Sequence, residues 1–477
     1  MRPWAKTDGR WWPWARTLVP VLVVAGVLVV GTAPAMAHAR LRGSQPTAAT
    51  TVVLPPAAVR LLFTEVVETG QSQVLVTGPD GRPVHRTRTQ RDPLDARVLV
   101  TALPAGLTPG TYVVSWRVLS VDGHPVSSSL RFAVGAATTP LTSTASVGLG
   151  PTVLGGSGRA LVDVSLLSLV GLTAFPLLAL RKGGTTLTAA AKAGVLARLR
   201  APLAIALLGG LLGNALLAVD TASQARGFPS GRVSSHLPEL YALLRDSHTG
   251  HLLVLREIGL LAVAGTLALG YGRSRSRARL RPRAAAVHLA GVVALLATVS
   301  LASHAGSASV DLWVATAIDW THLVAAGAWT GGLLALSLAG LPTARSISRL
   351  DAAAGAEQAG ALTAGFSDLA QLCMLVVLVT GTYQTLVHVT TVGELGGTAW
   401  GAELVAKLAL WATVLLVATA TTASLVPRVT ERASAASARL AACGELTGVI
   451  RFELAAAVAL IAVAAVLAGT APPDQLT

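Results

Sequence analysis

The residues best suited to hold a metal ion lie at two separate places in the N-terminal third of the chain. His38 follows directly after Ala35-Met36-Ala37, and Asp122 and His124 flank a glycine in the segment SVDGHPV. Residues two apart in an extended segment project to the same face, so this carboxylate and this imidazole lie close together. A terminal His38 adds its free amine and its ring. Three nitrogens and one oxygen form a ligand set that suits tetragonal Cu(II).

The amine of His38 becomes a ligand only if the chain is cleaved after Ala37, and the preceding residues have the pattern of an export signal. Basic residues precede a short apolar stretch, Leu18 to Val30, and residues 35–37 form a small-x-small cleavage site. We therefore interpret residues 1–37 as a signal peptide. The alternative is an uncleaved first membrane anchor.

Residues 38–135 have the pattern of a small all-β domain that would carry this metal site. Short β-branched segments such as GTYVVSWRVLS and SSLRFAVG are separated by turn signals such as GPDGRP. Strands at this spacing predict an immunoglobulin-like or cupredoxin-like sandwich. The small-residue segment ATTPLTSTAS begins a linker that we place at residues 136–158.

The rest of the chain is strongly apolar. The whole sequence is 52% hydrophobic and 13% charged, with a mean hydropathy of +0.62. This composition predicts a polytopic all-α membrane bundle of about eight helices over residues 159–473. The predicted spans lie near residues 159–180, 201–221, 251–271, 285–303, 313–338, 366–387, 403–426 and 451–471.

The basic residues orient these spans. Groups of arginine and lysine follow the first, third, fifth and seventh spans, so they share one side if the spans alternate. The positive-inside rule makes that side cytoplasmic, and the cytoplasmic membrane is the predicted location. The β domain and the C-terminus are then extracellular or periplasmic. The net charge of +14 therefore needs no nucleic-acid partner, and we expect none.

Several histidines fall within or beside the predicted spans. His304 and His388 lie at outer span ends, whereas His322 lies well inside the fifth span. Asp319 and Trp329 are spaced to share a helix face with His322. Because ionisable groups inside a membrane usually face the bundle interior or a water-filled cavity, we interpret His322 as functional. For His388 an interfacial position is the alternative.

Other polar residues admit structural explanations. His248 and His251 stand at the outer start of the third span, where they would lie below the β domain. We interpret Arg256-Glu257 and the pair at positions 451 and 453, Arg-x-Glu, as structural ion pairs or interface anchors.

The segments AHARLRGSQP, VRLLFTEVV and GTYVVSWRVLSVDGHPVSSSLRFAV resemble the CopC family of exported copper-binding β domains. The resemblance implies that His38, Asp122 and His124 bind Cu(II). Glu65 stands where some members place a further carboxylate near the site, and a solvated strand residue is the alternative. The chain has only 3 methionines, so the methionine-rich Cu(I) site of some members is not expected on this domain.

The segments SHAG, DWTHLVAAGAWTGGLL, FSDLAQLCMLVVLVTGTYQ and ELVAKLALW resemble CopD, the polytopic copper-transport partner of CopC. Together the two resemblances imply a CopC–CopD fusion that moves copper across the cytoplasmic membrane. His304 and His322 match the histidine-bearing segments of the family, and Cu(I) is the form expected in the membrane domain.

The sequence therefore predicts a protein that binds Cu(II) outside the cell and transfers copper across the membrane, with import favoured and a role in copper homeostasis or resistance. An extracellular copper chaperone is an expected partner. Two alternatives stay open. One is a membrane redox protein with haem between His304 and His388, and the other is copper sequestration or sensing without transport. No phosphate-binding loop or phosphorylation motif is present in the sequence, and no enzymatic activity is expected.

Overall fold

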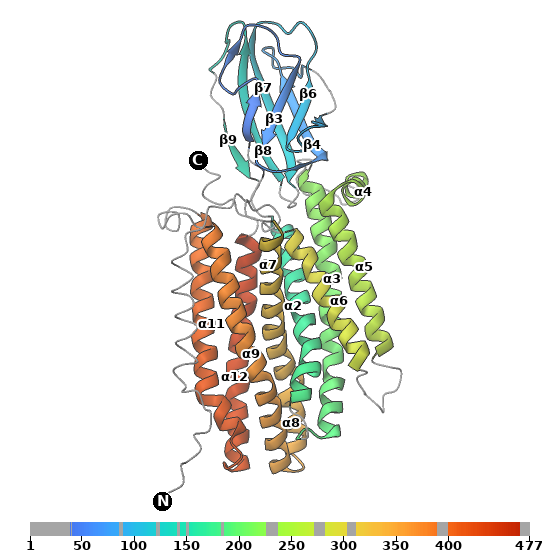
Figure 1. The fold of residues 1–477 in the computed structure, drawn as a ribbon, viewed down its shortest axis with the longest axis vertical. Coiled ribbons are helices and arrows are strands. Elements are labelled where there is room, and N and C mark those ends of the chain that lie inside the picture. The colour runs from blue at the N-terminus through green and yellow to red at the C-terminus, as the bar shows by residue number, and fades with distance from the viewer. Residues whose placement is uncertain are drawn as a thin grey trace, which may run out of the picture.

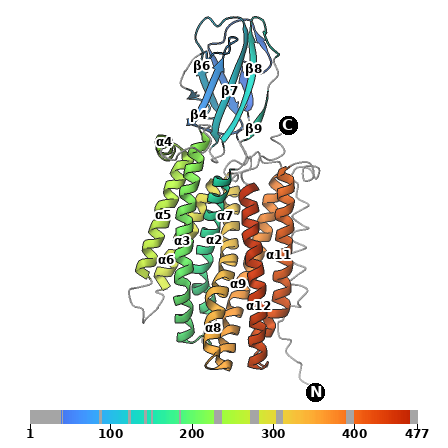
Figure 2. The same ribbon diagram turned by 180° about the vertical axis from the view of Figure 1, so that it is seen from behind.

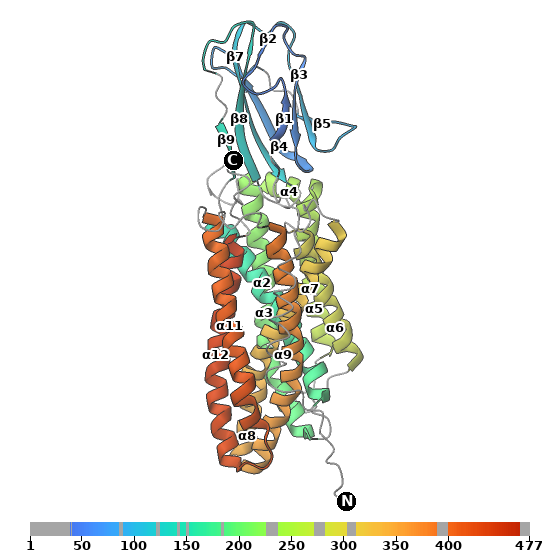
Figure 3. The same cartoon turned by 60° about the vertical axis from the view of Figure 1, so that its left-hand side comes forward.

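The computed structural model describes residues 39, 41–84, 89–120, 125–140, 144–148, 152–182, 186–225, 237–270, 282–302, 312–388 and 399–467. A β domain stands on one end of a long helical bundle (Figure 1). Views from behind and from the side show the same stacking (Figures 2 and 3). Both predicted fold classes, the β sandwich and the helical membrane bundle, are confirmed.

The β domain is built from two sheets. One sheet has the order β1-β3-β6-β5, formed by β1 (Leu41–Gln45), β3 (Ala58–Phe63), β6 (Val98–Ala102) and β5 (Gln90–Arg91). The other has the order β2-β8-β7-β4, formed by β2 (Thr51–Val52), β8 (Pro125–Val134), β7 (Gly110–Ser120) and β4 (Val67–Thr77). A further strand, β9 (Thr144–Gly148), pairs with β8 within the segment that the sequence assigns to the linker.

The core of the β domain lies between these sheets. Alternate residues of β3 are buried, as expected for a strand with one face toward the core. Phe63 and Phe132 are fully buried, and the ring of Phe132 stacks on Tyr112 with ring centres 5.4 Å apart. This core is separate from that of the bundle, so the β domain is stabilised by its own apolar contacts.

Within the described residues, 8 helices are long and apolar enough to cross a membrane, which confirms the predicted number. They are α2 (Val153–Lys182), α3 (Ala189–Ala225), α5 (His248–Gly270), α6 (Pro282–Leu301), α7 (Leu312–Ala335), α9 (Ala352–His388), α11 (Ala399–Thr430) and α12 (Ala436–Leu467). A π-helix, η3 (Leu336–Gly340), and the helix α8 (Leu341–Ser348) continue α7. The short helix α4 (Leu237–Asp246) precedes α5.

Several helices extend beyond the spans that hydropathy predicts. Helix α9 begins at Ala352 rather than near 366, and α12 begins at Ala436 rather than near 451. The extensions are more polar than the spans, and backbone hydrogen bonding continues through them because it does not depend on side-chain hydropathy. Arg345 and Arg439, which the sequence places in connectors, therefore lie on helices α8 and α12.

Polar contacts join the helices at the end of the bundle opposite the β domain. The Arg198 guanidinium on α3 donates to Thr343 and Ser346 of α8, at 3.1 and 2.8 Å. Arg345 donates to Thr447 of α12 at 2.7 Å. The described basic residues of the predicted cytoplasmic groups therefore gather away from the β domain. Which side of a membrane each end faces stays a prediction.

Candidate metal centre and membrane path

Of the residues predicted to bind Cu(II), Glu65 lies within the described part of the chain. His38, Asp122 and His124 lie outside the described residues. The strands on either side of them are described, however, and their register locates the end of the sandwich from which these residues emerge.

Three pairs of strands have paired ends at one end of the sandwich. Leu41, at the start of β1, pairs with Phe63 at the end of β3. Val67, at the start of β4, pairs with Ser120 at the end of β7. Leu119 pairs with Pro125 across the β7–β8 hairpin. The chain therefore enters β1, turns from β3 to β4 and turns from β7 to β8 at the same end of the domain.

Glu65 lies in the turn between β3 and β4 at this end. Its side chain is half-buried, and both carboxylate oxygens are shielded from solvent. A carboxylate placed there needs cations or hydrogen-bond donors beside it.

The same end of the β domain docks on the bundle. The backbone N–H of His248, at the first turn of α5, donates to Glu68 Oε1 at 2.6 Å. Leu119 of β7 packs in an apolar cluster with bundle residues that include Leu243 of α4 and Leu253 of α5. Strand β4 lies beside α4 in Figures 1 and 2. The strand ends at Phe63 and Ser120 therefore lie at the end of the β domain that docks on the helical bundle.

Asp92, beside β5, makes polar contacts with its own turn and with β3. Its Oδ1 accepts a hydrogen bond from the Leu94 N–H at 2.8 Å, and its Oδ2 pairs with Arg60 of β3. The Leu94 N–H, together with the Arg60 guanidinium, lowers the pKa of Asp92 below its ordinary value of 3.8. This contact ties the edge strand β5 to the rest of its sheet.

Two imidazoles lie at the outer end of α5, under the docked domain. His248 and His251 are exposed, and His251 Nε2 donates to the carbonyl of Arg245 at 2.8 Å. Of the other predicted residues, His304 lies outside the described residues. His388 ends α9, and its side chain lies outside the described part of the structure.

His322 lies on α7 about 15 Å along the helix from its first residue, Leu312, at 1.5 Å per residue. Its Nδ1 lies 2.9 Å from the Thr380 hydroxyl on α9. The Thr380 hydroxyl already donates its hydrogen to the Val376 carbonyl at 2.6 Å. It must therefore accept from His322 Nδ1–H, which leaves the lone pair on Nε2, the nitrogen that a metal would bind.

The predicted partners of His322 are only partly brought together. Asp319, one turn nearer the β domain, accepts a hydrogen bond from Gln384 of α9 at 3.2 Å. Lys407 of α11 interacts electrostatically with both His322 and Asp319. Trp329 lies two turns further along α7, where its ring meets Trp411 edge-on with centroids 5.8 Å apart. The described residues contain no group of three or more His, Cys, Asp or Glu side chains placed to hold a metal.

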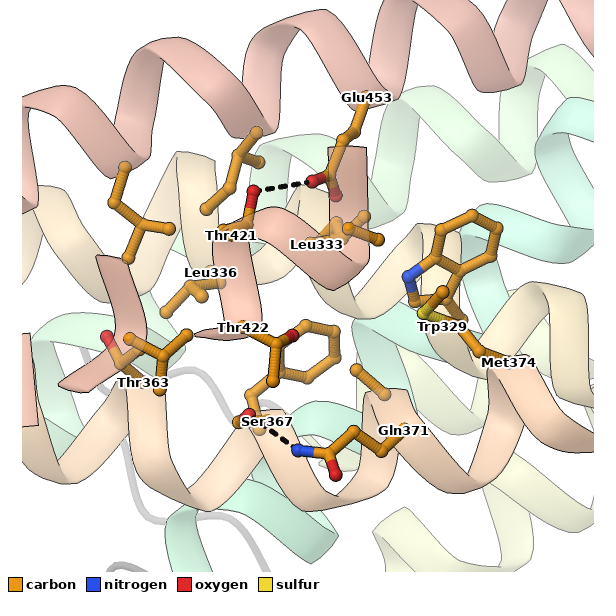
Figure 4. Close-up of a pocket in the computed structure, with 16 residues that line it drawn as sticks. Trp329, Leu333, Leu336, Thr363, Ser367, Gln371, Met374, Thr421, Thr422 and Glu453 are labelled. Atoms are coloured by element: carbon orange, nitrogen blue, oxygen red, sulfur yellow. Dashed lines mark hydrogen bonds between the residues drawn. The ribbon is translucent and has the colours of Figure 1, made fainter. Parts of the chain in front are cut away.

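A small cavity lies beyond Trp329, between α7, α9, α11 and α12 (Figure 4). It is about 50 Å³ in volume. Its polar lining includes Ser367 and Gln371 of α9, Thr421 of α11 and Glu453 of α12. The interpretation of Arg451 and Glu453 as an ion pair or anchor does not account for Glu453, because Arg451 is exposed whereas Glu453 is buried inside the bundle. The sequence-based predictions missed this lining. The four-residue spacing of Thr363, Ser367 and Gln371 along α9 is the sequence signal that could have indicated it.

The other predicted ion pair is also not formed between its two members. Buried Arg256 donates to Thr298 of α6 at 2.9 Å, whereas Glu257 accepts from Asn214 of α3 at 2.8 Å. The two neighbouring residues therefore connect α5 to two different helices, which is a structural role.

Two parts of the chain match two different protein families. Residues 41–135 match the family described as CopC domain, and residues 360–467 match the family described as Copper resistance protein D (CopD). Protein YobA of Escherichia coli K12 is 38% identical over 120 residues, which is 25% of this chain and 96% of YobA. Copper resistance protein C of Pseudomonas syringae pv. tomato is 33% identical over 124 residues, which is 25% of this chain and 96% of that protein.

A third relative is Copper transport protein CutJ of Bacillus subtilis 168, which is 28% identical over 128 residues, 27% of this chain and 22% of CutJ. Among solved structures, CopC from Methylosinus trichosporium OB3b is 31% identical with a TM-score of 0.20, covering 22% of this chain and all of that one. PcoC, a methionine-rich copper resistance protein from Escherichia coli, is 30% identical with a TM-score of 0.19, covering 20% of this chain and 99% of that one.

Two family matches in one chain, one on the β domain and one on helices α9 to α12, agree with the architecture. The long apolar helices make the chain a multi-pass membrane protein, and both families belong to copper resistance and transport. The chain is therefore a CopC–CopD fusion.

Proposed function

We propose that the β domain binds Cu(II) at its bundle-facing end and hands copper to the helical bundle, which moves it across the membrane. The observation that carries the proposal is the docking of this end. The strand ends at Phe63 and Ser120, which precede Glu65 and Asp122 in the chain, lie at this end, and Glu68 bonds to the first turn of α5.

The proposed Cu(II) ligands are the terminal amine and ring of His38, the carboxylate of Asp122 and the ring of His124. The register supports their meeting, because β1 begins three residues after His38 and pairs with β3 at the end where the β7–β8 hairpin turns. Glu65 adds a buried carboxylate at the same end. It serves as a further ligand or balances the charge of the copper ion.

The transfer route begins with the imidazoles below the docked domain. His248 and His251 are exposed there, and His322 offers its Nε2 lone pair deeper in the bundle. His304 and His388 are the other proposed outer positions on this route. Fusion keeps the donor site at a high effective concentration over these acceptors. In the bundle Cu(I) is the form proposed.

The proposed direction is import, in the service of copper homeostasis or resistance. The described basic residues gather at the end of the bundle away from the β domain, and the positive-inside rule would make that end cytoplasmic. The β domain would then capture copper outside the cell, from a copper chaperone or from solution.

Copper binding by the mature full-length protein tests the site. We expect His38→Ala and His124→Ala each to weaken Cu(II) binding by orders of magnitude, because each removes a nitrogen from a four-donor set. An alanine inserted between Ala37 and His38 should do the same, since the terminal amine then belongs to another residue. Binding is measured by copper titration with electron paramagnetic resonance, with exposed Asp80→Asn as the matched control.

Copper flux into proteoliposomes separates transport from sequestration. The wild-type protein should carry copper, and His38→Ala should slow the flux at limiting copper but less so at saturating copper, because it impairs capture rather than passage. An unchanged nitrogen-rich spectrum in the histidine variants would refute the binding site. Binding without any flux would refute the transfer.

A further inference from the structure

The cavity between α7, α9, α11 and α12 contains a carboxyl group that the copper route does not use. Glu453 is 3% exposed and lies near the middle of α12 (Ala436–Leu467). Among the described residues, no lysine, arginine or histidine forms an ion pair with it. An ionised carboxylate in such a place is strongly unfavourable, because burial removes it from bulk water and no described cation pairs with it.

The contact between Glu453 and Thr421 indicates where the hydrogen lies. Glu453 Oε1 is 3.4 Å from the Thr421 hydroxyl (Figure 4). That hydroxyl has a single hydrogen, which it donates to the Val417 carbonyl at 2.8 Å. A carboxylate would therefore place two acceptors side by side, whereas a protonated carboxyl can donate its own hydrogen to Thr421.

The cavity beside Glu453 can supply the water that would receive this proton. Its volume of about 50 Å³ exceeds the roughly 10–15 Å³ that one water molecule needs. The lining includes Thr363, which is 2% exposed and whose hydroxyl has no hydrogen-bond partner among the described residues. Ser367 and Gln371 continue this polar strip along α9, joined at 3.3 Å. A buried hydroxyl without a partner is typical of a site that holds water.

No other titratable side chain lines the cavity within the described structure. Helices α7, α9 and α11 contribute apolar, hydroxyl, amide and thioether groups to the lining. Asp368 on α9 and Arg451 on α12 are exposed and lie outside it. The buried thiols Cys373 and Cys443 are also absent from the lining. Proton exchange at this place therefore belongs to Glu453.

We propose that Glu453 is a proton-binding site of the membrane domain and that the adjoining cavity carries the water with which it exchanges its proton. In the exchange, the carboxyl O–H bond breaks and the proton passes to a cavity water, which leaves a carboxylate and a hydronium ion. Coupling of this step to copper movement rests on the proposed transport function. Proton binding itself does not.

Infrared spectroscopy of the full chain in lipid bilayers tests the proton site directly. The wild type should show the C=O stretch of a protonated carboxyl at neutral pH. Glu453→Gln should lose this band, and Glu445→Gln should retain it, because Glu445 is exposed and pairs with Arg428 at 2.7 Å. Identical spectra for wild type and Glu453→Gln would overturn the proposal.

A second variant tests the assignment even if Glu453→Gln fails to fold. Thr421→Val removes the acceptor of the Glu453 proton, so the band should move to higher frequency while remaining present. A band that does not move would count against the assignment.

The coupling is measured as copper flux into proteoliposomes over a range of internal pH. We expect Glu453→Gln to make the flux independent of internal pH, whereas Glu445→Gln behaves as wild type. If the wild-type protein carries no copper flux, the transport function is refuted. The infrared band would still show whether Glu453 binds a proton. A pH-dependent flux that survives in Glu453→Gln would refute the coupling.

Discussion

The imidazole of His322 is fixed by a single hydroxyl on the neighbouring helix. Because Thr380 donates to Val376, the Nδ1–H of His322 has its acceptor and Nε2 keeps its lone pair. Glu453 follows the same logic with Thr421, except that there the carboxyl must supply the hydrogen. In both places, a helix threonine whose hydrogen is already bonded to a backbone carbonyl can accept a hydrogen from its buried partner.

The contacts of the Asp92 carboxylate predict that it stabilises the β domain in a pH-dependent way. Its pKa is lowered by the Leu94 N–H and by Arg60, so the folded state favours the carboxylate. The stabilisation is fully present above the ordinary pKa of 3.8 and is lost as the pH falls through the folded value. Asp92→Asn should therefore lower the melting temperature of the isolated domain, residues 38–135, at pH 7, and the difference from wild type should shrink near pH 3.

The control for this prediction is Asp80→Asn, which changes an exposed residue of a turn. It should melt close to wild type at both pH values. A gap between wild type and Asp92→Asn that stays constant down to pH 3 would contradict the account of the Asp92 contacts.

Helix packing depends on glycines that allow backbones to touch. A Cβ added to Gly171 of α2 would lie 2.2 Å from the backbone of Gly331 on α7. Likewise, a Cβ on Gly158 would lie 3.0 Å from the Gly213 carbonyl on α3. Small residues at helix interfaces replace the hydrophobic driving force that a membrane lacks, because they bring long stretches of backbone into van der Waals contact.

Gly171→Ala should therefore separate α2 from α7 and destabilise the bundle by about 1–3 kcal/mol, the typical effect of overpacking. The matched control is Gly265→Ala on α5, where a Cβ would meet nothing within 4 Å. Thermal unfolding of the detergent-solubilised protein should show a lower midpoint for the first variant and no loss for the second. Equal midpoints for the two variants would show that the close contact is not required.

In the whole molecule, docking joins the β domain and the helical bundle into one unit. Glu68, which is 7% exposed, accepts the hydrogen bond from the first turn of α5, and Leu119 packs against α4 and α5. Helix α4 contributes Leu243 to the apolar cluster on which the β domain docks. The proposed transfer of copper from the β domain would therefore be directed toward the end of the bundle on which the domain rests.

Glu68→Ala should loosen this arrangement, since a buried N–H then lacks its acceptor at a cost of about 1–3 kcal/mol. Spin labels at exposed Leu94 and Tyr241 would report the distance between the β domain and α4. We expect a broader distance distribution than in the wild type and slower copper flux at limiting copper. Exposed Glu431→Ala, on the connector before α12, is the control, and a distribution as narrow as wild type in Glu68→Ala would argue against docking through this contact.

Local patterns in the sequence determined the two fold classes, the number of spans and the family resemblance. Strand alternation, apolar run length and short motifs are properties of neighbouring residues, so no tertiary contact is needed to recognise them. The same patterns predicted a functional His322 but not its partner, because Thr380 lies 58 residues away on another helix. The Cu(II) ligands His38, Asp122 and His124 stay predictions of the sequence.

Only the tertiary structure decided which end of the β domain meets the bundle and what surrounds Glu453. The Glu68–His248 contact joins residues 180 positions apart, and the Glu453 cavity needs four helices to close it. The polar strip on α9 has a periodic spacing, but the closure of the cavity and the Glu68–His248 contact depend on how finished elements pack together. Hydropathy therefore located the 8 long apolar helices of the described residues but could not distinguish an ion pair from a carboxyl that faces a cavity.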